Sequence, residues 1–243
     1  MTPRFHCPLP LAAGATIELP EGAAHHALRV LRLKPGDPIT LFDGDGGEYA
    51  ATLERAGARR AVARIDAWHD VERESPLVVT VVQGLAGGER MDFALQKAVE
   101  LGAAAVQPVA TARSVTRLDA ARADKRLVHW QQVAIAACEQ CGRNRVPTVR
   151  PLQDLHAWLR APTQASLRLL FAPDATQAIG EVERPDGAIE LLVGAEGGLT
   201  SDETAAALRA QFRAVRMGPR VLRTETAALA ALSALNALWG DWR

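Results

Sequence analysis

The apolar residues of this chain change their spacing near residue 76, and this change constrains the fold more than any other feature. Before it, short apolar stretches at residues 16–19, 39–42 and 49–53 are separated by segments rich in glycine, proline and aspartate. Short runs bounded by turn residues are typical of β-strands joined by tight connections. We therefore expect a small N-terminal β-barrel that ends in a linker within the charged segment 66–76.

After residue 76 the chain alternates continuous apolar runs with helical stripes. We expect strands at residues 77–82, 104–109, 167–172, 189–193 and 215–217, and helices at 91–101, 119–141, 201–212 and 225–239. Strands without polar alternation, separated by helices, favour a mostly parallel α/β sheet covered on both faces. The last helix is apolar on nearly every side, so we expect it to be buried, and a second subunit is one way to bury it.

The composition narrows the class of protein. The chain has 243 residues, 48% of them hydrophobic, with 28 Lys and Arg against 28 Asp and Glu. This balance excludes the wholesale basic binding of a histone-like protein but leaves a local basic groove open. Three cysteines, no basic-then-apolar leader and no apolar stretch long enough to span a bilayer predict a cytoplasmic protein without a membrane partner.

The first segment that could carry chemistry is the glycine-rich loop at residues 193–201, directly after an expected buried strand. Thr200 or Ser201 is expected to cap the helix that follows. The loop lacks both the Gly-Lys-Ser/Thr of a triphosphate loop and the glycine spacing of a dinucleotide fingerprint. Glu196 would repel phosphate, yet its carboxylate suits ribose hydroxyls or a cationic ligand. An ordinary strand-to-helix turn explains the loop equally well.

The second segment, at residues 217–227, also leaves a strand and enters a helix. It holds two arginines, one glutamate and two threonines within seven residues, and we expect Thr224 to cap the helix. Such a cap leaves backbone N–H groups facing outward. Polar groups this dense, between a buried strand and an apolar helix, would be costly without partners. We therefore favour a ligand site here over a structural cluster of ion pairs.

The third segment, at residues 138–147, lies where the long helix ends. Cys138 and Cys141 have C-x-x-C spacing, but a zinc site needs two further ligands, and a redox pair would sit at a helix start. Cys138 falls on the apolar stripe and is expected in the core. Arg143 and Arg145 either bind RNA phosphates or offset the helix C-terminal dipole. The histidines show no metal-binding or hydrolase spacing, so we expect no metal.

In this order, the segments resemble the RsmE family of ribosomal small-subunit RNA uridine-N3 methyltransferases, which belongs to the SPOUT superfamily of knotted methyltransferases. The resemblance covers nearly the whole chain, and its motifs lie at residues 26–37, 89–92, 96–102, 139–147, 193–199 and 218–227. The chain departs from the family pattern at three positions, with Gly87 for a common lysine, Cys141 for a common serine and Ala195 for a common proline. The missing lysine removes one potential RNA contact.

The resemblance implies a fold, a cofactor and partners. The implied fold is α/β, with a PUA-like, RNA-binding β-barrel at residues 1–70 and a SPOUT methyltransferase domain at residues 75–243 that ends in a deep trefoil knot. The implied cofactor is S-adenosylmethionine, held in the knot loops, and the chain is expected to form a homodimer across the knot helices. The implied substrate is a uridine of 16S rRNA, free or within the small ribosomal subunit.

The resemblance also implies which residues bind. Those expected at the cofactor are Val193, Gly194, Glu196, Gly197, Met217, Gly218, Leu222, Arg223 and Thr224. Those expected at the RNA are Arg29, Arg32, Arg90, Arg113, Arg143 and Arg145.

Methyl transfer to N3 of uracil needs no metal, but N3 carries a proton that must leave, so a base or an oxyanion stabiliser is required. We expect Arg223 or Arg143 to stabilise the uracil anion and Glu139 or Glu225 to act as the base. Two alternatives stay open. One is a methyltransferase of the same superfamily that acts on tRNA or at a ribose 2′-OH, and the other is a non-catalytic RNA-binding dimer.

Overall fold

The computed structural model describes residues 2–57 and 60–242. The chain divides into two compact units, which we call unit 1 (Met1–Glu74 with Ile135–Val146) and unit 2 (Ser75–Ala134 with Pro147–Arg243). Each unit has a hydrophobic core of its own. Unit 1 takes in the C-terminal end of the long helix α3 (Ala120–Cys141) and the turn that follows it.

Unit 1 is built on a five-stranded sheet in the order β1-β3-β4-β5-β2. Its elements are β1 (Arg4–His6), β2 (Thr16–Glu18), α1 (Glu21–His25), the π-helical turn η1 (His26–Val30), β3 (Pro38–Phe42), β4 (Glu48–Ala56) and β5 (Ala61–His69). The three stretches expected to be strands are found as β2, β3 and β4. The paired strands are antiparallel except β1 and β3.

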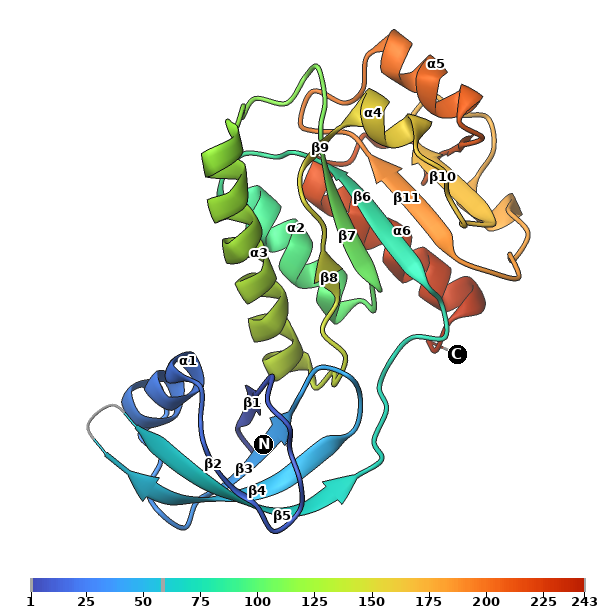
Figure 1. Cartoon of the computed structure of the whole chain (residues 1–243). Helices are drawn as coiled ribbons and strands as arrows, with labels where there is room; N and C mark the ends of the chain where they lie inside the picture. Colours follow the sequence, from blue (N-terminus) through green and yellow to red (C-terminus); the bar gives the residue numbers. More distant parts are fainter. Residues whose placement is uncertain (1, 58–59, 243) are drawn as a thin grey trace. The chain divides into compact units, whose positions relative to one another are not determined.

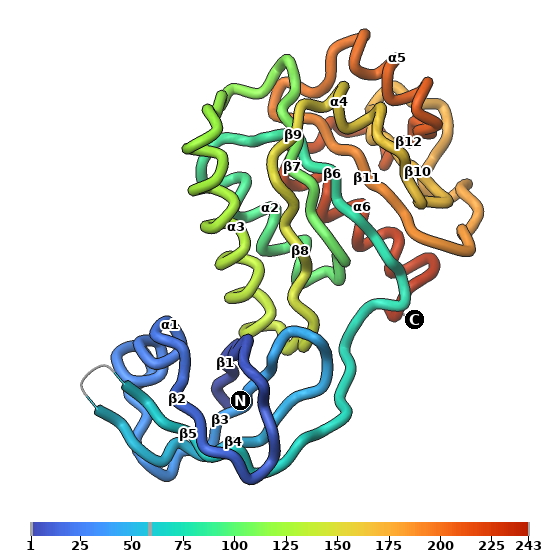
Figure 2. The backbone as a smooth tube through the Cα atoms, in the orientation of Figure 1, coloured from blue at the N-terminus to red at the C-terminus, as the bar shows by residue number. Residues whose placement is uncertain are grey.

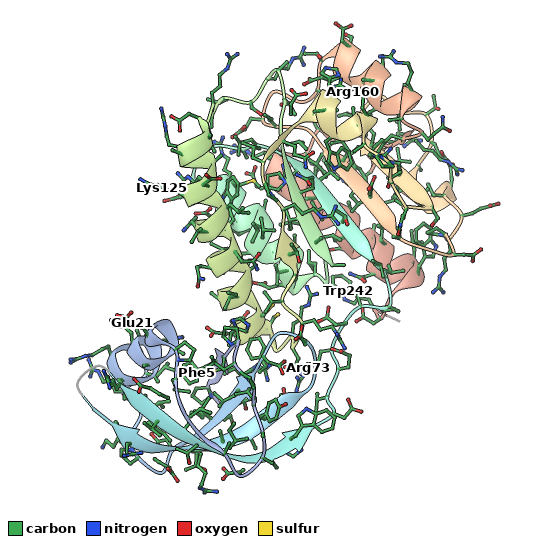
Figure 3. The ribbon with its side chains drawn as sticks, in the orientation of Figure 1. Phe5, Glu21, Arg73, Lys125, Arg160 and Trp242 are labelled. Atoms are coloured by element: carbon green, nitrogen blue, oxygen red, sulfur yellow. The ribbon has the colours of Figure 1, made fainter. Side chains whose placement is uncertain are left out.

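The hydrophobic core of unit 1 is formed by side chains from one face of these strands. Phe5, Leu41, Leu53 and Ile65 are fully buried. Figure 3 shows Phe5 inside this unit, whereas the labelled Glu21 lies at its surface. Burial alternates along β5, as expected when one face of a sheet packs on a core and the other meets water.

Unit 2 contains a parallel sheet in the order β12-β10-β11-β6-β7-β8, with β9 paired to β7. Its elements are β6 (Val79–Gly84), α2 (Glu89–Glu100), β7 (Ala105–Ala110), the first part of α3, β8 (Thr148–Val149), β9 (Gln153–Asp154), α4 (Leu155–Arg160), β10 (Leu167–Phe171), the 3-10 turn η2 (Ile179–Glu181), β11 (Ile189–Val193), α5 (Ser201–Arg209), β12 (Arg213–Val215) and α6 (Thr224–Trp239). The expected parallel α/β sheet is confirmed.

Several element ends differ from the sequence prediction; β6, for example, covers Val79–Gly84 rather than residues 77–82. Two of the differences have a cause that the backbone shows. Helix α5 ends at Arg209 rather than at residue 212, because Gln211 takes a φ of 67°, which breaks the helix. Strand β12 covers Arg213–Val215 rather than residues 215–217, because Arg216 leaves β10 and forms an isolated bridge with Ala178. The segment between β12 and α6 is therefore longer than the sequence suggested.

Helices cover both faces of this sheet (Figure 1). On one face, Val82, Leu170 and Leu192 of the strands pack with residues of α4 and α5 in a single apolar cluster. On the other face, α6 runs against β6 and β11 and beside α2. Figure 2 follows the backbone from β11 through α5 and β12 to α6, so that the C-terminal third of the chain returns to the middle of the sheet.

Helix α6 is buried along one face, which includes Ala228, Leu232 and Leu235, and not on nearly every side as its sequence predicted. The buried polar residue on this face, Asn236, donates to the carbonyl of Leu101 (2.8 Å) and accepts from the hydroxyl of Ser75 (2.9 Å). Other apolar residues of the helix remain half-buried within this one chain. No helix in the described part of the chain is both long enough and apolar enough to cross a membrane.

Candidate functional site

A pocket opens in unit 2 where β10, β11 and β12 end. It is lined by residues of the segments 171–173, 193–198 and 215–222, together with Thr224 and Ala227 of α6. Its cavity volume is about 140 Å³. Ligands of open α/β sheets bind beyond the carboxyl ends of the strands. This pocket is therefore the candidate site.

The two loops singled out from the sequence both line the pocket. The residues that were predicted to bind a cofactor and that line it are Val193, Gly194, Glu196, Met217, Gly218, Leu222 and Thr224. Gly197 and Arg223 were also predicted there, but they adjoin lining residues without lining the pocket themselves. Two distant strand-to-helix loops thus meet at one site.

The first loop is held in a tight turn. The amide of Gly198 donates to the carbonyl of Ala195 at 2.8 Å. Arg113, predicted to contact RNA, donates from Nη1 to the carbonyls of Gly197 (2.9 Å) and Leu199 (3.2 Å). Thr200 caps α5, as one of the two predicted candidates. Arg113 therefore braces the loop from outside.

Glu196 places a carboxylate at the pocket wall. Its Oε1 accepts from the amide of Gly87 (2.8 Å) and from Nη1 of Arg90 (3.3 Å). Its Oε2 is buried and has no hydrogen-bond partner among the described residues. Burial acts to raise the pKa of Glu196, but the Gly87 amide, its own amide and the Arg90 guanidinium outweigh burial and lower it. Glu196 is thus held as a carboxylate at the pocket wall, with one oxygen that has no partner among the described residues.

Thr224 does not cap its helix, contrary to the sequence prediction. The N-cap residue of α6 is Arg223, which makes no side-chain cap bond, and Thr224 is the first helical residue. The hydroxyl of Thr224 instead donates to the carbonyl of Gly194 (2.5 Å) and accepts from Nε2 of Gln83 (2.7 Å). These long-range partners, which the local pattern could not show, compete successfully with the cap.

Comparison with known proteins identifies the family. Residues 73–236 match the family model described as an RNA methyltransferase domain, and residues 19–66 match the one described as an RNA methyltransferase PUA domain. The ribosomal RNA small subunit methyltransferase E of Mycobacterium tuberculosis is 37% identical over 235 residues, which cover 95% of this chain and 88% of that protein. The chain belongs to the ribosomal RNA small subunit methyltransferase E family. The family member from Bacillus subtilis is 34% identical and covers 87% of this chain and 86% of its own length.

Solved structures agree with this family. The methyltransferase E of Neisseria gonorrhoeae, crystallised bound to S-adenosyl methionine, is 43% identical, with a TM-score of 0.93 and 100% of each chain covered. A putative methyltransferase from Legionella pneumophila, in complex with the bound cofactor SAM, is 36% identical, with a TM-score of 0.95 and 99% of each chain covered. The expected PUA-like N-terminal domain and parallel-sheet methyltransferase domain are confirmed.

Two of the predicted catalytic residues flank Thr224 at the pocket. Arg223 is exposed and directly precedes α6. Glu225 is half-buried in the first turn of α6, and its buried Oε2 has no hydrogen-bond partner among the described residues. Neither residue lines the pocket, although both adjoin Thr224, which does. In a member of the methyltransferase E family, this places an arginine and a carboxylate next to the wall of the site.

The other two predicted catalytic residues belong to unit 1. Arg143 is 4% exposed, and its Nε donates to Oε1 of Glu74 at 2.8 Å while its Nη2 pairs with Oε2 of the same carboxylate. The next residue, Asn144, is fully buried; it donates to the carbonyl of Val71 (2.7 Å) and accepts from Arg4 (2.5 Å). This family motif therefore fastens the end of α3 within unit 1.

The side chain of Glu139 is also bonded within unit 1. Its Oε1 accepts from the amide of His6 at 2.9 Å, and its Oε2 lies 4.0 Å from Nδ1 of His26. Burial raises the pKa of Glu139, although the amide of His6 and nearby positive groups oppose the shift. Cys138, one residue earlier, is fully buried as predicted, and burial raises the pKa of its thiol to about 12.

The remaining predicted RNA-binding residues divide between the two units. Arg29 lies in the last turn of η1 and Arg32 lies shortly after its end. Both are exposed, and Arg32 has a φ of 56°. Arg145 pairs with Glu72 through Nε at 2.7 Å and stays more than half exposed. In the described residues, no group of three or more His, Cys, Asp or Glu side chains could hold a metal ion.

Two parts of this site were not predicted from the sequence, residues 171–173 and Gln83. Residues 171–173 line the pocket because they follow β10 at the same edge of the sheet, and the end of that expected strand was the available signal. Gln83 was also missed, although a lone glutamine at the end of an apolar run is unusual in a buried strand.

Proposed function

We propose that this protein transfers the methyl group of S-adenosylmethionine to N3 of a specific uridine in 16S rRNA. The observation that carries the proposal is the meeting of the loops 193–198 and 215–222 in one pocket, in a chain of the ribosomal RNA small subunit methyltransferase E family. The methyltransferase E of Neisseria and the putative methyltransferase of Legionella, both solved with this cofactor bound, support the same donor.

The pocket residues suit the cofactor. Apolar walls come from Val193, Leu222 and Ala227, and the unpartnered Oε2 of Glu196 provides an acceptor for ribose hydroxyls or a positive charge. Gly194 lies so close to its own loop that a Cβ there would meet the backbone of Gly198 at 2.8 Å. S-adenosylmethionine, when bound, supplies an electrophilic methyl group. The protein has to hold this donor in line with the acceptor nitrogen.

Arg223 and Glu225 are our choice for the groups that act on uracil. The N3 proton must leave, and the negative charge that develops on the uracil oxygens needs stabilisation. Glu225 would accept the proton and Arg223 would stabilise the anion, because both adjoin Thr224 at the pocket wall. Arg143 and Glu139 are less suitable, because the side chain of each is already bonded to another residue of unit 1.

The substrate side of the proposal assigns RNA binding to both units. We propose that residues 1–70 form an RNA-binding domain that uses Arg29 and Arg32, and that residues 75–243 form the methyltransferase domain. Arg90 and Arg113 of unit 2 and Arg145 of unit 1 would add phosphate contacts, in addition to their contacts with Glu196, the first loop and Glu72. Arginine suits this role because its planar fork matches phosphate geometry.

The architecture of the active enzyme is also a proposal. We propose that the C-terminal loops and α6 form a deep trefoil knot and that two chains form a cytoplasmic homodimer across α6. The half-buried Leu229 and Leu238, on the flanks of the buried face of α6, support a helix that a second subunit covers further. Truncation before Glu225 should then abolish the dimer together with cofactor binding, which size-exclusion chromatography and calorimetry can follow.

The deciding experiment identifies the product. Purified protein is incubated with radiolabelled S-adenosylmethionine and small ribosomal subunits that lack the modification, and the RNA is digested to nucleosides. We expect the label in 3-methyluridine. Label in another nucleoside, or at a ribose 2′-OH, would keep the methyltransferase but overturn the target. RNA binding without any label, in subunits and in tRNA alike, would favour the non-catalytic RNA-binding dimer.

A further inference from the structure

Three chain segments of unit 2 meet in a short hydrogen-bond chain beneath the pocket. They are the end of β6, the loop after β11 and the start of α6. Nε2 of Gln83 donates to Oγ1 of Thr224 at 2.7 Å, and Oγ1 of Thr224 donates to the carbonyl of Gly194 at 2.5 Å. Gln83 is 1% exposed and Thr224 5% exposed, so water does not compete for these bonds. We call this chain the Gln83 latch.

The direction of each bond in the latch is fixed by its partners. Nε2 of Gln83 also donates to the carbonyl of Gly84 at 3.0 Å, and a carbonyl can only accept, which settles the orientation of the amide. The oxygen of Thr224 must therefore accept from Gln83. Its single proton is left for the carbonyl of Gly194, which also can only accept. An apolar side chain at position 83 has no donor and could not maintain this order.

The backbone is tightly packed at the same place. A Cβ on Gly84 would meet the amide nitrogen of Ala195 at 2.3 Å, so only glycine fits there. Gln83 itself is paired in register with Val193, the last residue of β11. The Gln83 latch thus lies where the backbone of β6 is tightly packed against the first pocket loop. Small displacements of the latch would therefore be transmitted to the loop.

Burial of Gln83 is not explained by stability. Its Oε1 is buried and has no hydrogen-bond partner among the described residues. An unpaired buried acceptor is costly, and an apolar side chain of similar size would avoid that cost. The two N–H donors account for the side chain instead, because one holds Thr224 at the start of α6 and the other holds the carbonyl of Gly84, which packs against the first pocket loop.

We propose that Gln83 is a positioning residue for the methyl-donor pocket, acting through Thr224 to fix the carbonyl of Gly194 and the first turn of α6. The proposal rests on the proposed function only in naming the ligand. Gln83 does not line the pocket, whereas Thr224 and Gly194 do. Its loss should therefore change the shape and mobility of the wall without removing a contact to the ligand.

The neighbouring strand offers a matched control. Gln107 of β7 is also 1% exposed, and its Nε2 also donates to the carbonyl of the next residue, Pro108 (2.8 Å), and to one distant partner, the carbonyl of Pro151 (2.9 Å). Gln107 does not line the pocket and contacts no residue of the latch among the bonds described. Gln107→Leu therefore removes an equivalent buried amide in the same sheet.

The test measures the Kd for S-adenosylmethionine by calorimetry in Gln83→Leu and Gln107→Leu. We expect the Kd to rise ~10-fold in Gln83→Leu, equivalent to roughly 1.4 kcal/mol, and to stay within ~2-fold of the unmodified protein in Gln107→Leu. The KM for the donor should rise in Gln83→Leu while kcat at saturation changes less, because the reacting groups remain. Equal changes in Kd in both variants would overturn the proposal.

Amide hydrogen exchange provides a readout that needs no ligand. We expect faster exchange at residues 194–199 and 224–227 in Gln83→Leu but not in Gln107→Leu. Unchanged exchange in these segments would contradict the latch even if the protein bound a different ligand. If the unmodified protein does not bind S-adenosylmethionine, the proposed function fails, and the exchange data still decide about the latch. If Gln83→Leu does not fold, Gln83→Met replaces it with a side chain of closer length.

A double-mutant cycle separates the latch from general loosening. Gln83→Met and Thr224→Val each remove one end of the same bond, so the increase in Kd of the double variant should be smaller than the product of the single increases. Fully multiplicative effects would mean that the two residues act independently and would overturn the assignment.

Discussion

Two arginine-rich segments of this molecule lie at the end of a helix or strand, one at residues 139–146 in unit 1 and one at residues 217–227 in unit 2. They look alike in sequence, since both combine arginines with a glutamate and a glycine. In the structure they differ. Arg143 is buried and bonded to both carboxylate oxygens of Glu74, whereas Arg223 is exposed beside the pocket. The partner of an arginine, rather than its local sequence, decides whether it holds the fold or can act on a ligand.

The same contrast applies to the carboxylates. Both carboxylate oxygens of Glu74 are bonded to Arg143, 69 residues away, whereas Glu225 has a buried oxygen without a partner among the described residues. A satisfied buried pair favours one conformation, and removal of either member leaves an uncompensated charge. An unsatisfied carboxylate beside a pocket is typical of a functional site. The predictions below test this difference.

The largest effect is expected from loss of the buried ion pair. Arg143→Met leaves the carboxylate of Glu74 largely buried without its partner, which should lower the free energy of unfolding by ~3 kcal/mol. Denaturant titration, followed by tryptophan fluorescence, measures the change. The double variant Arg143→Met with Glu74→Gln should recover part of the loss, because no unpaired charge remains. A single variant as stable as the parent would refute a structural role for Arg143.

A large effect on rate, with little effect on stability, is expected at the second segment. Arg223→Ala should lower kcat by ~10²–10³, as for loss of one oxyanion-stabilising donor. The free energy of unfolding should change by less than ~0.5 kcal/mol, because the side chain is exposed. Methyl transfer to small subunits and denaturant titration give the two values. Arg209→Ala, on the exposed end of α5, is the control and should leave both unchanged.

The contrast also explains how much could be predicted from the sequence. The two pocket loops were found because each follows an apolar run and precedes a helix, which are local patterns. Their meeting follows from the parallel order of β10, β11 and β12. The bonds of Thr224 could not be found in the same way, because Gln83 lies 141 residues away and Gly194 lies 30 residues away.

Unit 1 gives the same lesson in the opposite direction. Its three longest-range polar contacts join Arg4, in the first strand, to residues 142–144 near the middle of the chain. A local pattern shows the charges of this segment but not their partners. The sequence therefore predicted ligand contacts for Arg143, which in the structure is bonded to Glu74, 69 residues away.

The stability of the protein is expected to fall in acid because of Glu48. Glu48 in unit 1 accepts from Arg73 (2.8 Å) and Arg4 (2.5 Å), and these bonds, led by that of Arg73, lower its pKa to about 2 in spite of burial. A depressed carboxyl pKa adds stability above its unfolded value of about 4.5, and this contribution disappears as the pH falls from there through about 2. We expect a loss of roughly 2 kcal/mol over this window.

Thermal unfolding followed between about pH 5 and about pH 2 measures this loss. Glu48→Gln should be less stable at the upper limit and should show a flatter pH dependence, because the titrating group is gone. Glu54→Gln is the control, since Glu54 is an exposed residue on the same strand whose pair with Arg64 is more open to water. An unchanged slope in Glu48→Gln would assign the acid sensitivity to other carboxylates.

The smallest effects are expected at Arg29 and Arg32, two exposed arginines of unit 1. If Arg29 and Arg32 contact RNA phosphates, Arg29→Gln and Arg32→Gln should each weaken RNA binding a few-fold and reduce the slope of log K against log salt by about one. Filter binding at several salt concentrations measures the slope. Arg55→Gln, an exposed arginine of β4, controls for net charge. An equal loss of slope in all three variants would mean that the RNA responds to the total charge of unit 1, whereas a loss confined to Arg29 and Arg32 would locate the contact at η1. Such a result would add a third kind of arginine to the comparison, one that is neither paired in a core nor placed at the pocket.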